Sequence, residues 1–206
     1  MLDCPSVPQV ERGMQEFRRH EPRDAMYRVA AFLVEHYWGE ASQIADGLGV
    51  LLLTWNNAFY RFGSFDFDAL ERCIRLNQAT LDAFRNRDIQ SWSSEDDDPT
   101  SALFLQLSTS LQIREGKAKG RRSPVAVAKA LHVLAPAFFP IWDSKIAVRY
   151  RCRYDQDPPS SYLKFARNMK RCVGLLQAAG FKVPPGKTML KVIDEYNYAK
   201  FTKAWI

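Results

Sequence analysis

Apolar residues recur every three or four positions along most of this chain, which is the spacing that places them on one face of an α-helix. The first such stripe is formed by Met26, Val29, Ala30, Leu33 and Tyr37. No segment alternates apolar and polar residues with the period of two that is typical of a half-buried strand. The pattern therefore predicts an all-α fold.

Glycine, proline and clusters of polar residues divide this pattern into about eight helices. The predicted helices cover approximately residues 22–38, 40–62, 65–87, 99–114, 124–135, 144–150, 160–179 and 187–201. Residues 1–20 are polar and contain two prolines, so we expect a loose N-terminal arm. A chain of 206 residues, 47% of them hydrophobic, can bury one substantial core or two small lobes, and we expect residues 1–206 to form a single helical domain.

The chain is basic, with 29 Lys and Arg residues against 23 Asp and Glu residues, a net charge of +6 and a pI near 9.2. This balance suits a polyanionic partner, but many basic proteins bind none, so the local arrangement of charge must decide. Residues 115–122 contain two glycines and four cations between two predicted helices. Because glycine lets a backbone approach a phosphate closely, this segment suits contact with a DNA backbone; a mobile solvated loop is the alternative.

The four cysteines, Cys4, Cys73, Cys152 and Cys172, follow neither a zinc-binding spacing nor a Cys-x-x-Cys pattern. We therefore expect free thiols in a reducing cytoplasm. The sequence has no amino-terminal signal segment and no apolar run of 18 residues, so we expect an intracellular protein outside the membrane. The acidic run Glu95–Asp98 is more typical of a solvated linker, or of the start of the next helix, than of a metal site, and we expect neither a bound metal nor a cofactor.

Residues 123–150 combine features that an ordinary surface helix does not require. Ser123 is a suitable N-cap, and the helix that it begins carries Lys129 and His132 three positions apart. An apolar segment, Phe138–Trp142, follows, and Asp143 then offers a carboxylate N-cap to the next helix. A carboxylate in this position is held firmly, which suits a plain helix cap, a chemical role, or both.

Residues 141–146 (IWDSKI), followed by a helix with an arginine, resemble the end of the helix-hairpin-helix motif of DNA glycosylases. In that family an aspartate at a helix start assists cleavage of the base–sugar bond, and in bifunctional members a lysine on the preceding helix attacks the sugar. The resemblance implies these roles for Asp143 and Lys129. It also implies a two-lobed helical bundle with its helix-hairpin-helix-like core in residues 99–150.

The chain departs from the family pattern around the hairpin. Residues 116–122 replace the expected Gly-Val-Gly, and the linker from Lys129 to Asp143 is shorter than in the family. Lysines that compete with Lys129 as the nucleophile are Lys117, Lys119 and Lys145. The resemblance implies DNA binding through Lys117, Lys119, Arg121, Arg122, Ser123 and Lys145.

A second similarity lies in Trp55-Asn56-Asn57, which follow an apolar run. The 8-oxoguanine DNA glycosylases have a similar helix that ends in asparagine, and there an asparagine fills the gap left by the flipped base. By this resemblance Asn56 or Asn57 takes that place, unless the pair is the exposed end of an ordinary helix. The side chains expected to line a base pocket, with core packing as the alternative, are Trp55, His132, Trp142, Tyr196 and Asn197.

The resemblance thus implies a DNA glycosylase, a monomer that flips a modified base out of double-stranded DNA and excises it, with or without lyase activity. The base would be oxidised guanine, in DNA repair, or a hypermodified phage base, in anti-phage defence. A non-enzymatic helical DNA-binding module and a helical protein-interaction scaffold are the alternatives.

Overall fold

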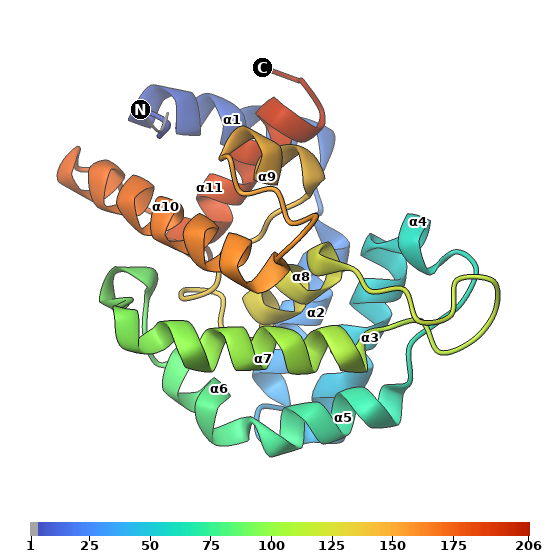
Figure 1. Ribbon diagram of the computed structural model, residues 1–206. Helices are drawn as coiled ribbons and strands as arrows, with labels where there is room; N and C mark the ends of the chain where they lie inside the picture. The colour runs from blue at the N-terminus through green and yellow to red at the C-terminus, as the bar shows by residue number, and fades with distance from the viewer. Residues whose placement is uncertain (1–3) are drawn as a thin grey trace.

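The computed structural model describes residues 4–206 and is helical throughout that range, with no β-strand (Figure 1). The all-α prediction is confirmed, although these residues form eleven α-helices and not about eight. They are α1 (Val7–His20), α2 (Ala25–His36), α3 (Ala41–Trp55), α4 (Asn57–Tyr60), α5 (Phe67–Leu76), α6 (Gln78–Arg85), α7 (Asp97–Ser110), α8 (Pro124–Leu134), α9 (Ser144–Arg149), α10 (Pro158–Ala178) and α11 (Met189–Asn197). A π-helical turn, Tyr198–Thr202, follows α11. Over residues 4–206 no helix is both long and apolar enough to cross a bilayer.

Two asparagines account for part of the difference in helix number, because each interrupts a segment that we predicted as one helix. Asn56 separates α3 from α4, and Asn77 separates α5 from α6. The side-chain amide of Asn77 donates to the carbonyl oxygen of Cys73 at 2.8 Å, so it competes with the backbone for a helical acceptor. Asparagine is a weak helix former for this reason.

The expected loose arm is instead helix α1, so that prediction is wrong over Val7–His20. Pro8 lies in the first turn, where its missing N–H leaves no helical bond unmade, and the backbone N–H of Ser6 donates to the Gln9 side chain at 2.9 Å. Helix α1 packs against α11. Its buried side chains are Val10, Met14 and Phe17. A narrow apolar stripe among many polar residues is therefore enough to dock this helix.

A disulfide joins Cys4, just before α1, to Cys172 on α10, so the prediction of four free thiols is wrong for this pair. Their Cα atoms lie 5.1 Å apart, within the range that a disulfide bridges. Cys73 and Cys152 are free and buried. No local spacing can signal a bridge between cysteines 168 residues apart, because it depends on how α1 packs against the late helices.

Helix α8 lies at the centre of the molecule and contacts α2, α3 and α7 (Figure 1). All of its residues from Ala126 to Leu134 are buried, Lys129 and His132 among them. In Figure 1, α1, α9, α10 and α11 lie on one side of α8, and α3, α5, α6 and α7 lie on the other. Two ionisable side chains on a fully buried helix require polar partners inside the protein.

The predicted apolar stripe of the first long helix is only partly buried in α2. Ala30 and Val34 are buried on the side that meets α3 and α8. Met26 and Val29 are 49% and 57% exposed, which corrects their expected place in the core. Met26 is consequently free to line a surface pocket.

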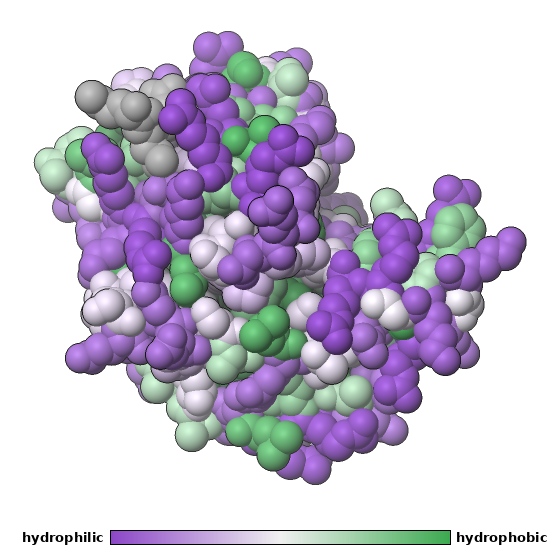
Figure 2. Space-filling model, in the orientation of Figure 1, coloured by the Kyte–Doolittle hydropathy of each residue, from purple (hydrophilic) through white to green (hydrophobic). Residues whose placement is uncertain are grey.

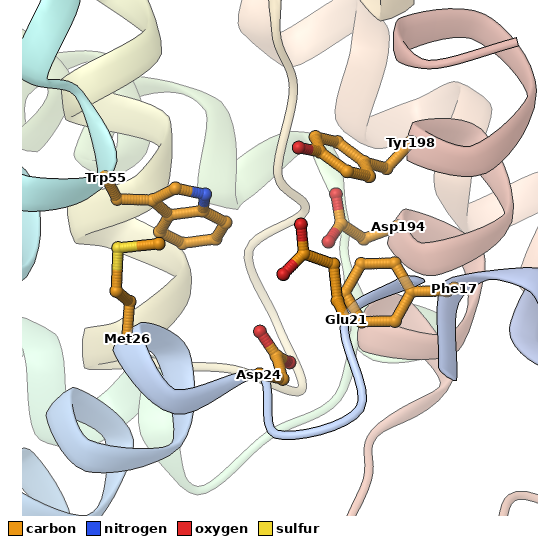
Figure 3. Close-up of a pocket in the computed structure, with 7 residues that line it drawn as sticks. All are labelled: Phe17, Glu21, Asp24, Met26, Trp55, Asp194 and Tyr198. Atoms are coloured by element: carbon orange, nitrogen blue, oxygen red, sulfur yellow. The ribbon is translucent and has the colours of Figure 1, made fainter. Parts of the chain in front are cut away.

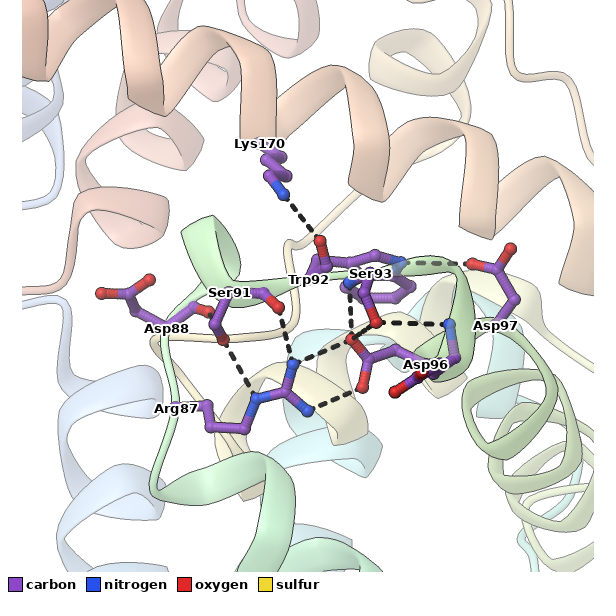
Figure 4. Close-up of polar contacts among 9 residues, drawn as sticks. Arg87, Asp88, Ser91, Trp92, Ser93, Asp96, Asp97 and Lys170 are labelled. Atoms are coloured by element: carbon purple, nitrogen blue, oxygen red, sulfur yellow. Dashed lines mark hydrogen bonds and ion pairs between the residues drawn. The ribbon is translucent and has the colours of Figure 1, made fainter.

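The acidic run forms a folded turn and the first turn of α7, so the start of the next helix is confirmed and the solvated linker is not (Figure 4). The guanidinium of Arg87 donates to both carboxylate oxygens of Asp96, at 2.6 and 2.8 Å, and these bonds lower the pKa of Asp96. The backbone N–H of Ser93 donates to the same carboxylate at 2.7 Å. The amine of Lys170 donates to the carbonyl oxygen of Trp92 at 2.6 Å, which ties the turn to α10.

Candidate active site

Lys129 is buried in the central helix α8, with 7% of the residue exposed. Its amine donates to the carbonyl oxygen of Trp55 at 3.0 Å and lies 4.4 Å from the centroid of the Trp55 ring. Burial lowers the pKa of Lys129 to about 8, against smaller opposing effects of Asp194 and Asp143. About a tenth of this amine is therefore neutral at pH 7, far more than for an ordinary lysine, and the neutral amine is the nucleophilic form.

Asp143 is the N-cap of α9, as its position after the apolar segment predicts. Its Oδ1 accepts from the backbone N–H of Ile146 at 2.8 Å, and its Oδ2 accepts from the hydroxyl of Thr202. The carboxylate is thus oriented by two separate elements, α9 and the π-helical turn after α11. Because its charge acts on Lys129, the two residues that the resemblance singles out lie in one neighbourhood.

Asp194 on α11 belongs to the same neighbourhood, although no sequence motif marks it. The residue is 6% exposed, and the amine of Lys191 lies 3.7 Å from its Oδ2. Burial raises the pKa of Asp194 to about 7, while Lys191 acts in the opposite direction. The amine of Lys191 is closer to Asp24, at 2.9 Å, so Asp194 is the less well neutralised of these two carboxyl groups.

These groups adjoin a pocket between the α1–α2 connection and α11 (Figure 3). The side chains that line it are Phe17, Glu21, Asp24, Met26, Trp55, Asp194 and Tyr198. Figure 3 shows Trp55 and Met26 on one side, with Asp194 and Tyr198 opposite them. The pocket has a cavity volume of about 70 Å³ and is partly open to solvent. Aromatic walls with carboxyl groups between them suit a flat ring that has polar atoms on its edge.

Of the five residues predicted to line a base pocket, Trp55 belongs to this lining. His132 is fully buried, with its Nδ1 2.7 Å from the carbonyl oxygen of Phe139 and its Nε2 3.2 Å from the hydroxyl of Tyr27. Burial lowers the pKa of His132 to about 3, so the ring is neutral. His132 is therefore a hydrogen-bonded histidine of the core, which was the alternative to a place on the pocket wall.

Trp142, Tyr196 and Asn197 are buried in the core and are not part of this lining, as the alternative of core packing expects. The indole N–H of Trp142 donates to a backbone carbonyl of α8 at 3.1 Å. The hydroxyl of Tyr196 accepts from the amine of Lys200 at 2.7 Å, and Oδ1 of Asn197 accepts from the hydroxyl of Tyr150 at 2.9 Å. Helix α11 is buried on nearly all sides, so its aromatic and amide groups serve packing.

The predicted DNA-binding hairpin is one half of a projection that we call the paired loops, residues 56–66 and 111–123 (Figure 1). Figure 2 shows this projection standing out from the body, with hydrophilic side chains over much of it. The backbone N–H of Arg114 donates to the carbonyl oxygen of Ser64 at 2.9 Å. At Gly116, where φ is +77°, an added Cβ would lie 2.5 Å from the carbonyl oxygen of Phe62. Close backbone contact therefore joins the two loops.

Asn56 and Ser123, both predicted to contact DNA, bind each other at the base of the paired loops. The amide of Asn56 donates to the hydroxyl oxygen of Ser123 at 3.2 Å. Ser123 also caps α8, because the same oxygen accepts from the backbone N–H of Ala126 at 3.1 Å. Asn57, in contrast, is exposed at the start of α4. Of the two asparagines, Asn57 is the one whose side chain is available to a partner.

The predicted DNA-contacting cations of the hairpin are all exposed on the paired loops: Lys117, Lys119, Arg121 and Arg122. The guanidinium of Arg121 lies 5.6 Å from the centroid of the Phe59 ring, a cation–π contact between the two loops. Lys145 is exposed on α9, where its amine donates to the carbonyl oxygen of Thr202 at 2.8 Å. Unlike these exposed lysines, Lys129 is buried beside the pocket, which favours it as the nucleophile.

A buried amine, an oriented carboxylate and a pocket carboxyl group thus occupy one region of the protein. They can add an amine to an electrophilic carbon while carboxyl groups hold charge or supply protons. Over residues 4–206 no three potential metal ligands lie close enough together to hold an ion. No protein-family model matches the chain, and no curated protein or solved structure is significantly similar to it.

Proposed function

We propose that this protein is a DNA glycosylase, which excises a modified base from double-stranded DNA. The observation that supports this function best is the buried amine of Lys129, which contacts Trp55 of the pocket lining and interacts with Asp143. Base excision needs a site for an extruded base, a nucleophile at the sugar and a group that stabilises positive charge on the sugar. Trp55, Lys129 and Asp143 are suited to these three tasks.

In the proposed reaction the extruded base enters the pocket beside Trp55. Positive charge develops on the sugar as the base–sugar bond breaks, and the carboxylate of Asp143 stabilises that charge. The neutral amine of Lys129 then bonds to the sugar carbon and forms a Schiff base, which permits strand cleavage. If a water molecule attacks in its place, the product is an abasic site in an intact strand.

The paired loops are the proposed contact with the DNA backbone. Their exposed cations would neutralise phosphates, and exposed Asn57 would fill the gap left by the extruded base. The helices on the two sides of α8 would then correspond to the two lobes of a helix-hairpin-helix glycosylase, acting as a monomer in the cytoplasm. Oxidised guanine, in DNA repair, and a hypermodified phage base, in anti-phage defence, are the proposed substrates.

Borohydride trapping on duplexes with modified bases tests this function. The panel contains oxidised, alkylated, deaminated and glucosylated bases, and heat with alkali reveals abasic sites in parallel. We expect the wild-type protein to form a trapped adduct that Lys129→Gln abolishes. Abasic sites without a trapped adduct would identify a water-using enzyme that depends on Asp143.

Lys164→Gln is the matched control, because it removes an amine that is exposed on α10 and belongs neither to the pocket lining nor to the predicted DNA contacts. We expect this variant to keep the trapped adduct. Absence of base release from the whole panel, with equal binding of modified and normal duplexes, would overturn the proposal in favour of a non-enzymatic DNA-binding module. Negligible binding at any salt concentration would favour a protein-interaction scaffold.

A further inference from the structure

We propose that Asp194 is a second catalytic carboxyl group, which passes a proton to the base as the base–sugar bond breaks. This inference rests on the proposed function, because it assigns a role within the same reaction. Asp194 is part of the pocket lining, whereas Lys129 and Asp143 act from outside that lining. A base that departs as an anion is a poor leaving group, so a proton supplied inside the pocket makes its bond to the sugar easier to break.

The position of Asp194 brings it within reach of a bound base. Figure 3 shows its carboxyl group on the wall opposite Trp55, and both side chains line the same pocket. The side chain of Asp194 is only 7% exposed, so a ring that enters the pocket displaces most of the water in contact with this carboxyl group. Asp143, in contrast, has both oxygens engaged by Ile146 and Thr202, which suits it to hold charge.

The charges around Asp194 favour a carboxyl group that keeps its proton. The charged groups that act on it are Lys191 and Glu195 on its own helix, Asp24 before α2, Asp143 before α9 and Lys129 on α8. Further titratable groups nearby are Glu21, which also lines the pocket, and the hydroxyls of Tyr27 and Tyr198.

Two lysines serve three carboxyl groups in this cluster, and the amine of Lys187 donates to both carboxylate oxygens of Glu195, at 2.7 and 2.6 Å. The amine of Lys191 lies 2.9 Å from Asp24 and 3.7 Å from both Asp194 and Glu195. Burial in this predominantly acidic surrounding raises the pKa of Asp194 to about 7, so that a large share of the group is protonated at neutral pH. Geometry and charge therefore both make Asp194 a proton donor for the pocket.

In the step that we infer, the bond between the sugar carbon and the base nitrogen breaks, and its electron pair stays on the base. The proton of the Asp194 carboxyl group moves to a ring nitrogen or oxygen of the base, which leaves as a neutral molecule while Asp194 becomes a carboxylate. The electron pair of the Lys129 amine, or of water, forms the new bond to the sugar carbon. The attacking atom then loses a proton to solvent, so the number of protons balances.

The test compares Asp194→Asn with the wild-type protein in two assays. The first is single-turnover release of the modified base that the wild-type protein excises fastest, measured from pH 5 to pH 9. The second is the affinity for a duplex with a tetrahydrofuran residue, an abasic-site analogue that has no base to protonate. Asparagine has the shape of aspartate but no acidic proton, and Asp155→Asn, at an exposed site outside the pocket lining, is the matched control.

We expect Asp194→Asn to lower base release about 100-fold, the order of magnitude of general acid catalysis, and to change tetrahydrofuran-duplex affinity less than about threefold. With Lys129 as the nucleophile, wild-type release should be maximal between about pH 7 and pH 8, because Asp194 loses its proton above about pH 7 while Lys129 becomes neutral near pH 8, and the decline at higher pH should be absent in Asp194→Asn. Asp194→Glu should recover at least a tenth of the lost rate.

Two results would overturn the role of Asp194 and leave the proposed function intact. One is base release by Asp194→Asn that keeps the wild-type rate and pH profile. The other is a parallel loss of base release and tetrahydrofuran-duplex affinity, which would mean that Asp194 only maintains the shape of the pocket. A wild-type protein that releases no base from any duplex would instead overturn the proposed function, and this inference with it.

Discussion

At the scale of single residues, burial moves the two ionisable groups beside the pocket toward their uncharged forms. It lowers the pKa of Lys129 to about 8 and raises the pKa of Asp194 to about 7. A neutral amine is a nucleophile and a protonated carboxyl group is an acid, so the same physical cause prepares both groups for opposite tasks. Burial of ionisable groups reduces the stability of the fold. The protein nevertheless keeps these two groups buried, at a site that is suited to chemistry.

Lys129→Met should stabilise the protein at neutral pH. The thioether keeps most of the apolar stem but removes an amine whose charge burial disfavours. A shift of one pKa unit corresponds to about 1.4 kcal/mol, and part of the gain is offset by the lost hydrogen bond to Trp55, so we expect an increase of about 1–3 kcal/mol in the free energy of unfolding. Urea denaturation at pH 7 measures it.

The pH dependence of this gain is its control. The amine loses its proton near pH 8 in the folded protein but near pH 10.5 in the unfolded chain. Between these values the unfolded state binds more protons, so the stability of the wild-type protein rises with pH relative to Lys129→Met. The difference in unfolding free energy between the two proteins should therefore have its maximal value below pH 8 and decrease toward pH 10.5. A difference that is constant over this range would contradict the burial of a charged amine.

Asp143→Asn and Asp143→Ala should separate the structural role of this residue from its proposed chemical role. Asparagine caps a helix about as well as aspartate, whereas alanine removes the cap and costs about 1 kcal/mol. We expect thermal melting to show near-wild-type stability for Asp143→Asn and lower stability for Asp143→Ala. Both variants should lose at least about 100-fold in base release, because neither has a charge to stabilise the sugar. Activity that follows stability, with Asp143→Asn active, would mean that Asp143 is only a cap.

At the scale of elements, the paired loops depend on a backbone contact that tolerates no side chain at Gly116. Gly116 and Gly120 both have positive φ, +77° and +82°, so alanine is strained at either position. An added Cβ at Gly116 meets the carbonyl oxygen of Phe62 at 2.5 Å, whereas at Gly120 it meets nothing within 4 Å. We expect Gly116→Ala to lower the free energy of unfolding by at least about 1 kcal/mol more than Gly120→Ala in urea. Equal losses would show that the loops are not held by this contact.

The cations of the paired loops should account for a large part of the salt dependence of DNA binding. Each lost phosphate contact reduces the slope of log affinity against log salt by about 0.9. Changing Lys117, Lys119, Arg121 and Arg122 to glutamine should therefore reduce the slope by up to about 3.6, as measured by fluorescence anisotropy. The control variant changes Arg12, Arg18, Arg171 and Lys182, which are exposed outside the paired loops. If both variants reduce the slope equally, net charge and not the paired loops binds the DNA.

The starts of α8 and α9 could be predicted from local signals in the sequence, whereas α1 was not predicted although Ser6 and Pro8 mark its start. Ser123 and Asp143 cap α8 and α9 as expected, because an N-cap is a property of a few consecutive residues. The pocket could not be predicted in the same way, since its lining comes from α1, α2, α3, α11 and their connections. The available signal for Asp194 is that Lys191, Asp194 and Glu195 interrupt a late apolar helix, but a helix end on the surface gives the same pattern.

At the scale of the whole molecule, charge is unevenly distributed. The paired loops contain six cationic and two acidic residues, a net charge of +4, while the whole chain has a net charge of +6. The pocket lining contains three acidic residues and no cation. A basic projection beside an acidic pocket suits a ligand whose phosphates and bases are recognised by different parts of the protein, and this division follows from packing that no single segment of sequence encodes.

The disulfide between Cys4 and Cys172 makes the N-terminal helix part of the molecule as a whole. It closes a loop of 168 residues, and α1, which it anchors, contributes Phe17 to the pocket. Loops of this length give stabilisation near the upper end of the observed range, so reduction should lower the free energy of unfolding by about 3–5 kcal/mol in urea. The double variant Cys4→Ser/Cys172→Ser should resemble the reduced protein and show no further effect of reductant.

Thiol titration measures whether the bond between Cys4 and Cys172 is formed in the active protein. Disulfides are uncommon in reducing compartments, so the state of the bond determines whether α1 is covalently tethered during function. In the unreduced, denatured protein we expect two titratable thiols, those of Cys73 and Cys152, and four after reduction.

Amide hydrogen exchange in the reduced protein should increase in α1 before it increases in the buried α8, because α1 loses a covalent tether and α8 loses none. Four thiols before reduction, or exchange in α1 that reductant leaves unchanged, would show that packing against α11 alone holds this helix in place.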